Sequence, residues 1–83
     1  MQKTVYKGPC SGLYNSYTFE KVMRDRCEKV YSPKSDLQIL HEQHGVTIKY
    51  WRVKNIATVI LFSEDNSKLS IVEKMILQLE KEN

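Results

Sequence analysis

A chain of 83 residues with a hydrophobic content of 41% can form one domain with one modest core. So few residues leave little material for the walls of an enclosed cleft, which argues against an enzyme with a deeply buried site. The formal net charge of +3, from 13 basic and 10 acidic side chains, is weakly basic. We expect a single domain over residues 1–83, because no repeat, linker or low-complexity tract divides the sequence.

The chain has no apolar N-terminal segment behind a basic start, and its longest apolar run, Val59 to Phe62, is too short to span a bilayer. We therefore expect a cytoplasmic protein that does not act at a membrane. In a reducing cytosol Cys10 and Cys27 are expected to be free thiols, although the two would form one disulfide if the chain were exported by another route.

In chain order, the first predicted element is a short strand at "KTVYK", residues 3–7, at an edge of a sheet. Such an edge can also pair between subunits, so a homo-oligomer is one expectation. The loop "GPCSGLYNSYTF" follows, with the Tyr, Ser, Asn and Gly content of recognition loops. We expect Tyr14, Asn15 and Tyr17 to contact a partner from this loop. The alternative is that Leu13 and the two tyrosines fold back and close the loop on the sheet.

A first helix is predicted to begin near Thr18, whose hydroxyl can cap it, and to end before Pro33, because the residue preceding proline avoids helical angles. One side of this helix is apolar and the other is charged, as in an ordinary amphipathic helix. The apolar side contains Phe19, Val22, Met23, Cys27, Val30 and Tyr31, and the charged side contains Lys21, Arg24, Asp25 and Glu28.

The stretch "SDLQILHEQHG" supports two interpretations. As a helix, it begins on a capping-box spacing and places His41 and His44 on one face. As a strand, Leu37 and Ile39 alternate with polar residues before a turn at Gly45. The strand is favoured, because a short connection at the glycine would join it to the next strand as a meander.

Residues 46–53 and 56–63 are predicted to form a β-hairpin, with Lys54 and Asn55 as the tight connection. In the second strand, Ile56, Thr58, Ile60 and Phe62 point one way, and Ala57, Val59 and Leu61 point the other way. Both sets are largely apolar, which predicts a central strand covered on each side.

A last helix is predicted from the capping-box pair Ser70 and Glu73. Its apolar stripe is Val72, Met75, Ile76 and Leu79, and its solvent side contains Lys74, Gln78 and Lys81. The whole pattern predicts an α+β fold with a small antiparallel sheet of three to four strands, including the hairpin 46–53/56–63, packed against two or three helices.

If residues 36–43 form a strand, the order helix, three strands, helix resembles that of double-stranded RNA-binding domains and of small endoribonuclease toxins. The resemblance covers the order of the elements. The RNA-binding family has a lysine-rich start to its last helix, where this chain has Lys68 and Lys74. The toxins use a histidine on the sheet, and His41 is the residue that would supply it.

Catalytic and metal-binding patterns are weak. In "HEQHG", His41 and His44 are three residues apart, but a metal site needs a third ligand and none is suitably spaced. We expect no metal and no cofactor. Cys10 lies in the turn-like "GPCSG" and would need one of the two histidines as its base to act as a nucleophile. We therefore expect no enzyme, with a Cys/His-dependent activity or a small endoribonuclease as the alternative.

The leading hypothesis is a non-enzymatic module that binds another protein and acts as a regulator or inhibitor, with a phage or mobile element as an expected origin. The partner-binding residues are expected to be Tyr14, Asn15, Tyr17, Lys49, Trp51, Arg52 and Lys54. The alternative is a protein that binds RNA or DNA through the hairpin 46–55 and the basic face of the first helix. In an alternating strand, Lys49 and Trp51 share one face, whereas Tyr50 and Arg52 share the other.

Overall fold

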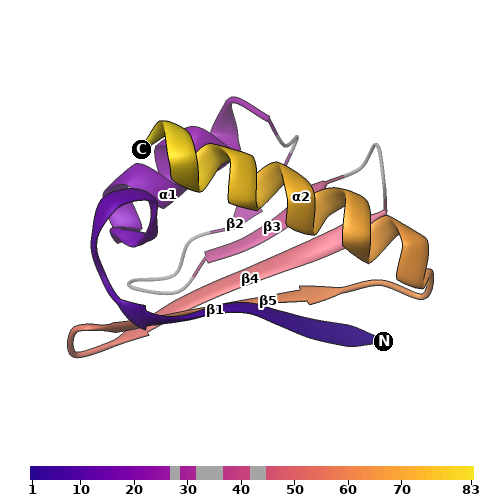
Figure 1. Ribbon diagram of the computed structural model, residues 1–83, viewed down its shortest axis with the longest axis horizontal. Helices are drawn as coiled ribbons and strands as arrows, with labels where there is room; N and C mark the ends of the chain where they lie inside the picture. The colour runs from indigo at the N-terminus through magenta and orange to yellow at the C-terminus, as the bar shows by residue number, and fades with distance from the viewer. Residues whose placement is uncertain (27–28, 32–36, 42–44) are drawn as a thin grey trace.

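The computed structural model describes residues 1–26, 29–31, 37–41 and 45–83, with side chains described for 1–26 and 45–83. The elements follow one another as shown in Figure 1. They are β1 (Gln2–Pro9), the 3-10 turn η1 (Gly12–Tyr14), α1 (Ser16–Arg24), β2 (Lys29–Tyr31), β3 (Leu37–His41), β4 (Val46–Val53), β5 (Ile56–Phe62) and α2 (Asn66–Glu82).

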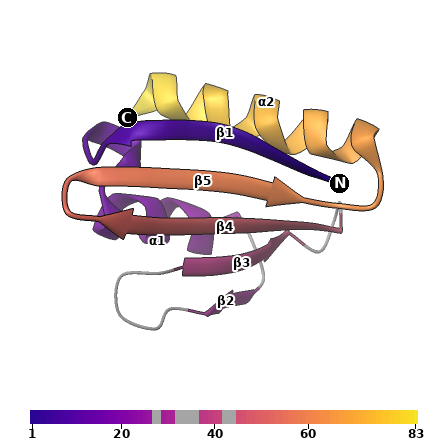
Figure 2. The same ribbon diagram turned by 90° about the horizontal axis from the view of Figure 1, so that it is seen from below.

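The strands form one small antiparallel sheet in the order β1-β5-β4-β3-β2, which Figure 2 shows strand by strand. The predicted α+β class with a small antiparallel sheet is therefore confirmed. The expected three to four strands are too few, because the described residues form five. Three of these strands, β1, β5 and β4, have described side chains. Two α-helices in the described part of the chain accompany the sheet, together with the short turn η1.

The first helix is shorter than the sequence pattern predicted, and its continuation to Pro33 is wrong. Helix α1 ends at Arg24, and Lys29–Tyr31 form β2, which pairs with β3. The segment contains a β-branched and an aromatic residue, whose strand preference prevails once a neighbouring strand supplies hydrogen-bond partners. The helix also begins earlier than predicted, because the side chain of Asn15, and not that of Thr18, caps it.

The strand interpretation of residues 37–41 is confirmed, since β3 pairs with β4 along its length. In the sequence, four strands, β2 to β5, therefore come after α1 and before α2. The order that resembles RNA-binding domains and endoribonuclease toxins has three strands in this place, so the resemblance does not hold for the observed fold.

The hairpin of β4 and β5 is confirmed with its predicted connection, and Val53 pairs with Ile56 across the turn. Lys54 adopts a φ of 57°, in the left-handed region that a tight two-residue connection requires. Gly45, which precedes β4, has a φ of 62° and uses the backbone freedom expected of a glycine at that point.

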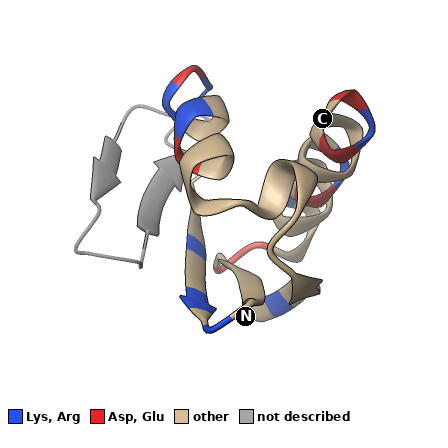
Figure 3. Ribbon diagram, turned by 90° about the vertical axis from the view of Figure 1, so that its left-hand side faces the viewer, with Lys and Arg blue, Asp and Glu red and all other residues tan. Residues whose placement is uncertain are grey.

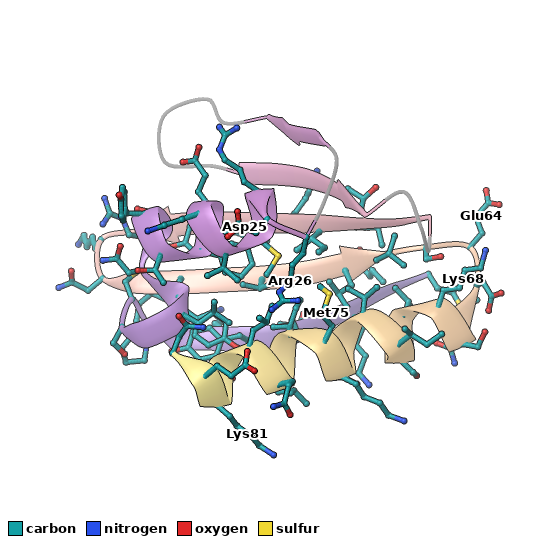
Figure 4. All side chains as sticks on the ribbon, turned by 90° about the horizontal axis from the view of Figure 1, so that it is seen from above. Asp25, Arg26, Glu64, Lys68, Met75 and Lys81 are labelled. Carbon is teal, nitrogen blue, oxygen red and sulfur yellow. The ribbon has the colours of Figure 1, made fainter. Side chains whose placement is uncertain are left out.

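Both helices and η1 pack on the same face of the sheet, as Figures 1 and 3 show. The core between the layers contains the inward residues of β4 and β5 and the apolar stripes of the helices. Its buried members are Leu13, Tyr14, Phe19, Met23, Val46, Ile48, Tyr50, Ala57, Val59, Leu61, Leu69, Val72, Ile76 and Leu79. Viewed from the helix side, Met75 of α2 points toward α1, whereas Lys81 points away from it (Figure 4).

Strand β5 is central in the sheet, as predicted, but the expectation that it is covered on each side is wrong. Ala57, Val59 and Leu61 are fully buried beneath the helices. On the opposite face, Ile56 is 44% exposed and Phe62 is half-buried. The apolar character of both faces therefore arises from a core on one side and a surface on the other that no described element covers.

Helix α2 begins four residues before the predicted capping pair. The carboxylate of Asp65 accepts a hydrogen bond from the backbone N–H of Ser67 at 2.9 Å and caps the helix. Ser70 lies inside the helix, and its hydroxyl donates to the carbonyl of Asn66 at 3.5 Å. The predicted apolar stripe is nevertheless correct, because its phase does not depend on where the helix begins.

Strand β1 lies at an edge of the sheet, as predicted. The register with β5 shifts between Thr4 and Tyr6, so Val5 forms a bulge, and the strand ends on Pro9. Bulges, prolines and lysines at an edge hinder pairing with a further strand. Assembly through this edge stays a prediction.

Candidate functional site

The candidate site is the face of the sheet opposite the helices, which we call the open face (Figures 1 and 3). Strand alternation and register decide its members, because residues paired across two strands point to the same side. The open face of the three strands with described side chains consists of Gln2, Thr4, Lys7 and Pro9 from β1, Thr47, Lys49, Trp51 and Val53 from β4, and Ile56, Thr58, Ile60 and Phe62 from β5.

Two aromatic rings and one lysine lie on the middle strands of the open face. Trp51 and Phe62 are both half-buried, so each ring keeps part of its surface in solvent. The Nζ atom of Lys49 lies 5.4 Å from the centroid of the Phe62 ring, within the range of a cation–π interaction. Thr58, which pairs with Trp51 across the strands, is only 8% exposed. The neighbours of Thr58 on the open face therefore cover its side chain.

The hairpin end of the open face is apolar. Val53 and Ile56 pair with each other and are 63% and 44% exposed. Pro9 of β1 pairs with Ile56 and extends this apolar area to the sheet edge. The open face thus has an exposed apolar area at its hairpin end.

The charge of the strands has one sign. The five strand ranges contain lysine and arginine but no aspartate or glutamate. Lys7 and Lys49 lie on the open face, and Lys54 lies in the turn that ends the hairpin. Figure 3 shows blue on the described strands, whereas red gathers on the helices and on the segment before α2. On β1, β4 and β5, whose side chains are described, a ligand on the open face therefore meets lysines and no carboxylate.

Tyr14 is the clearest departure from the sequence analysis, because the expectation that it contacts a partner from an exposed loop is wrong. It is 3% exposed, and its ring stacks on Tyr6 with a centroid distance of 3.5 Å. Its hydroxyl donates a hydrogen bond of 2.6 Å to the carboxylate of Glu80 on α2. Burial, followed by this carboxylate, raises the pKa of Tyr14. The loop folds back onto the core, as in the alternative interpretation.

Tyr50 continues the same aromatic cluster on the helix side. Its ring stacks on Phe19 of α1 at 4.9 Å, and its buried hydroxyl donates to the backbone carbonyl of Tyr14 at 2.7 Å. Burial raises the pKa of Tyr50 to about 12. The two tyrosines therefore hold η1 between β4 and α2, so their role in the structure is to close the fold.

The other predicted contact residues are divided between the two sides of the molecule. Asn15 is occupied in capping α1, with its side chain accepting from the N–H of Tyr17 at 3.0 Å. Tyr17 is 74% exposed on α1. Arg52 is exposed but lies on the helix side by register, since it pairs with the buried Ala57. Lys49, Trp51 and Lys54 are thus the predicted residues that lie on or beside the open face.

The outer surface of α1 does not join the hairpin in one nucleic-acid surface, as the sequence alternative required. The helix covers the opposite side of the sheet (Figure 1). Its Arg24 is paired with Glu20 at 2.6 Å, and Asp25 follows. Beside Tyr17 there is a shallow hollow of about 330 Å³ whose lining carries both signs of charge: Tyr17, Glu20, Lys21, Arg24 and Asp25.

A larger hollow of about 600 Å³ adjoins the open face beyond Phe62 and Thr47. Its remaining lining residues are Met1, Gly45, Ser63, Glu64, Asp65 and Lys68. Glu64 and Lys68 both lie at the α2 N-terminal end of the molecule (Figure 4). The carboxylates of Glu64 and Asp65 offset the charge of Lys68 here, so this hollow is not a basic extension of the open face.

Most of the residues on which catalysis or metal binding would depend lie outside the described side chains, namely Cys27, His41 and His44. Cys10 is half-buried beside the aromatic cluster, and its backbone N–H donates to Asn55 at 3.0 Å. Within residues 1–26 and 45–83, no three His, Cys, Asp or Glu side chains gather where they could hold a metal ion. No helix in the described residues is long and apolar enough to cross a membrane.

Sequence reasoning missed Lys7, Ile56 and Phe62 as members of the candidate site. The signal was present, because the alternation of β5 placed Ile56 and Phe62 on one side of the strand. Alternation does not say which side the helices cover. In comparisons with known proteins, no family model, curated protein or solved structure matches the chain.

Proposed function

We propose that the protein is a non-enzymatic module that binds nucleic acid on the open face of its sheet. The observation that carries the proposal is the joint presence there of Trp51, Phe62 and Lys49, on strands that contain no acidic residue. Aromatic rings on a flat surface bind bases, and lysines beside them neutralise phosphates. A pure protein interface would need neither the exclusion of carboxylates from all strands nor the ring and ammonium in contact.

The sequence favoured binding to a protein through the loop before α1, and the structure of that loop is the reason for proposing nucleic-acid binding instead. A protein-binding loop depended on Tyr14 and Tyr17 facing solvent together, but Tyr14 is buried and hydrogen-bonded to Glu80. Asn15 is occupied as a helix cap. The loop therefore offers one exposed ring, whereas the open face offers two half-exposed rings and a continuous surface.

The test is titration of a fluorescently labelled oligonucleotide of about 12 nucleotides, followed by anisotropy at several salt concentrations. With Lys7, Lys49 and Lys54 as phosphate contacts, log K is expected to fall with log salt at a slope of about −2. The affinity is then expected to drop about 20-fold between about 50 and 200 mM salt. Absence of binding at the lower salt concentration would rule out the proposed function.

A second candidate is a protein-binding regulator or inhibitor that uses the outer surface of α1. The observation that favours it is the 74% exposure of Tyr17 beside a hollow of mixed charge, where a partner can form ion pairs of either sign. A photo-reactive phenylalanine analogue placed at position 17 or at position 51 in the native cell separates the two. A nuclease-resistant protein adduct from position 17, with no nucleic-acid adduct from position 51, would favour the second candidate.

A further inference from the structure

We infer that the open face binds a single strand of nucleic acid, with bases stacked on Trp51 and Phe62 and phosphates held by Lys7 and Lys49. The inference rests on the proposed function and narrows it to one class of ligand. Bases in a duplex are stacked on one another and present only their edges in the grooves. Rings that lie on a flat sheet can reach a base only where the strand is unpaired.

The register gives the spacing of the two rings. Phe62 pairs with Thr47, and Trp51 lies four residues further along the same strand as Thr47. Four residues of antiparallel strand span about 13 Å. Because the two rings are on neighbouring strands, a single strand can cross the sheet obliquely and place bases on both. The hairpin thus provides two stacking positions that are separated but lie on one surface.

The lysines lie between and beside the rings. Lys49 pairs with Ile60 across the strands, in the row between the Phe62 row and the Trp51 row. Its ammonium lies 5.4 Å from the centroid of the Phe62 ring, from where it can move onto a neighbouring phosphate when a base stacks on that ring. Lys7 pairs with Thr58, which places it in the same row as Trp51. Each ring therefore has a lysine near it, and in a single strand each base likewise has a backbone phosphate near it.

The two lysines of β1 supply a matched pair for testing the face. Lys3 pairs with Leu61 on the helix side and forms an ion pair of 2.8 Å with Glu73. Lys7 lies on the open face of the same strand. The variants Lys3→Gln and Lys7→Gln change the net charge equally, so a difference between them reports on the face and not on total charge.

The experiment uses Trp51 as its own reporter, since the chain has one tryptophan. The full-length protein is titrated with three probes: an oligothymidine of about 12 nucleotides, its duplex with oligoadenosine, and poly-L-glutamate. The single strand is expected to quench Trp51 fluorescence and to bind about 10-fold or more tightly than the duplex. Poly-L-glutamate, which has charge but no bases, is expected to bind more weakly without quenching.

Variants then separate stacking from charge. Trp51→Ala and Phe62→Leu are each expected to weaken single-strand binding by about 10-fold, whereas Trp51→Phe keeps most of the affinity. Lys7→Gln is expected to reduce the salt slope by about one phosphate contact, whereas Lys3→Gln leaves it unchanged. Circular dichroism of each variant checks that it folds. The quenching titration uses the unmodified protein and therefore does not depend on the folding of any variant.

The outcomes distinguish the inference from the proposed function. If no nucleic acid binds at low salt, the proposed function fails. If single strand and duplex bind equally and Trp51→Ala has no effect, nucleic-acid binding stands and the single-strand inference is overturned. If poly-L-glutamate binds as tightly as the oligonucleotide and quenches Trp51 equally, the face recognises acidic proteins and both proposals fail.

Discussion

Tyr50 and Trp51 are neighbours on β4, yet they lie on opposite faces of the sheet. Tyr50 is 1% exposed, stacks on Phe19 and donates its hydroxyl to a backbone carbonyl. Trp51 is half-buried on the face that the helices leave uncovered. On the helix side a large ring is needed to fill the core, whereas on the open face a ring of similar size is left available for contact.

The two faces also differ in the partners of their charged side chains. On the helix side, Lys3 pairs with Glu73 and Arg24 pairs with Glu20. On the open face, Lys49 lies over an aromatic ring, and the strands carry no carboxylate. The two ion pairs found in the described residues are thus on the helix side, whereas Lys49 on the open face lies beside a ring and not beside a carboxylate.

The largest expected effect is on stability, and it compares the two neighbours on β4. Tyr50→Ala removes a core ring and its hydrogen bond, and it is expected to reduce the free energy of unfolding by about 3–5 kcal/mol. Trp51→Ala is expected to reduce it by about 1 kcal/mol, because the ring is partly in solvent. Urea unfolding measures both. Equal losses for the two variants would mean that the open face is as structurally essential as the core.

The next effect concerns the two loop tyrosines. Tyr14→Phe removes the hydrogen bond to Glu80 and is expected to lower the free energy of unfolding by about 1–2 kcal/mol. Tyr17→Phe, on the exposed outer surface of α1, is expected to change it by less than about 0.5 kcal/mol. The same unfolding measurement compares them. A larger loss for Tyr17→Phe would show that the burial assigned to Tyr14 is incorrect.

Alkaline pH provides a further test of the buried cluster. Burial raises the pKa of Tyr50 to about 12, above the ordinary tyrosine value of 10.0. Because the folded pKa is raised, the stabilisation is fully present below pH 10 and is lost as the pH rises toward 12. Tyr50→Phe is expected to flatten this part of the stability profile, measured by urea unfolding between pH 9 and pH 11. A profile unchanged by the substitution would contradict the raised pKa.

A smaller effect is expected at the N-terminus of α2. Asp65→Ala is expected to lower the unfolding midpoint, whereas Ser70→Ala, at the cap predicted from sequence, is expected to leave it nearly unchanged. Hydrogen bonds from Ser67 lower the pKa of Asp65 below its ordinary value of 3.8. Its stabilisation is therefore present above pH 3.8 and is lost as the pH falls through the lowered folded value. Asp65→Asn should keep the cap and remove that acid dependence.

The smallest expected effect is at the exposed ion pair between Lys3 and Glu73. Lys3→Gln is expected to change the free energy of unfolding by less than about 0.5 kcal/mol, because both side chains are partly in solvent and salt screens them. A thermal melt at low and high salt checks this. A large loss would show that the edge strand depends on this pair to stay on the sheet.

Local patterns in the sequence were sufficient for the hairpin and for the apolar stripe of α2. Alternation decides which residues of β4 share a face, and helical spacing decides which residues of α2 are buried. The same patterns overextended α1, because residues up to Tyr31 fit a helical stripe as well as a strand. Pairing of β2 with β3 is a long-range interaction that periodicity does not contain.

The site was less predictable than the fold for a similar reason. Lys49 and Trp51 were chosen because basic and aromatic residues cluster on this strand, and alternation placed the two on one face, whereas the choice of Tyr14 depended on a loop being exposed. Its burial depends on the return of α2, 66 residues later in the chain, which brings Glu80 to its hydroxyl. The membership of Phe62 in the open face depends on the helices covering the other side, which only the tertiary structure decides.

The most direct test of the central claim is a map of backbone amide chemical shifts as a single-stranded oligonucleotide is added to the protein. If the open face is the binding surface, the shifts are expected to concentrate at Lys7, Lys49, Trp51 and Phe62, with the outer surface of α1 around Tyr17 unchanged. Shifts confined to α1, or no shifts at saturating oligonucleotide, would contradict the assignment of the open face as the binding surface.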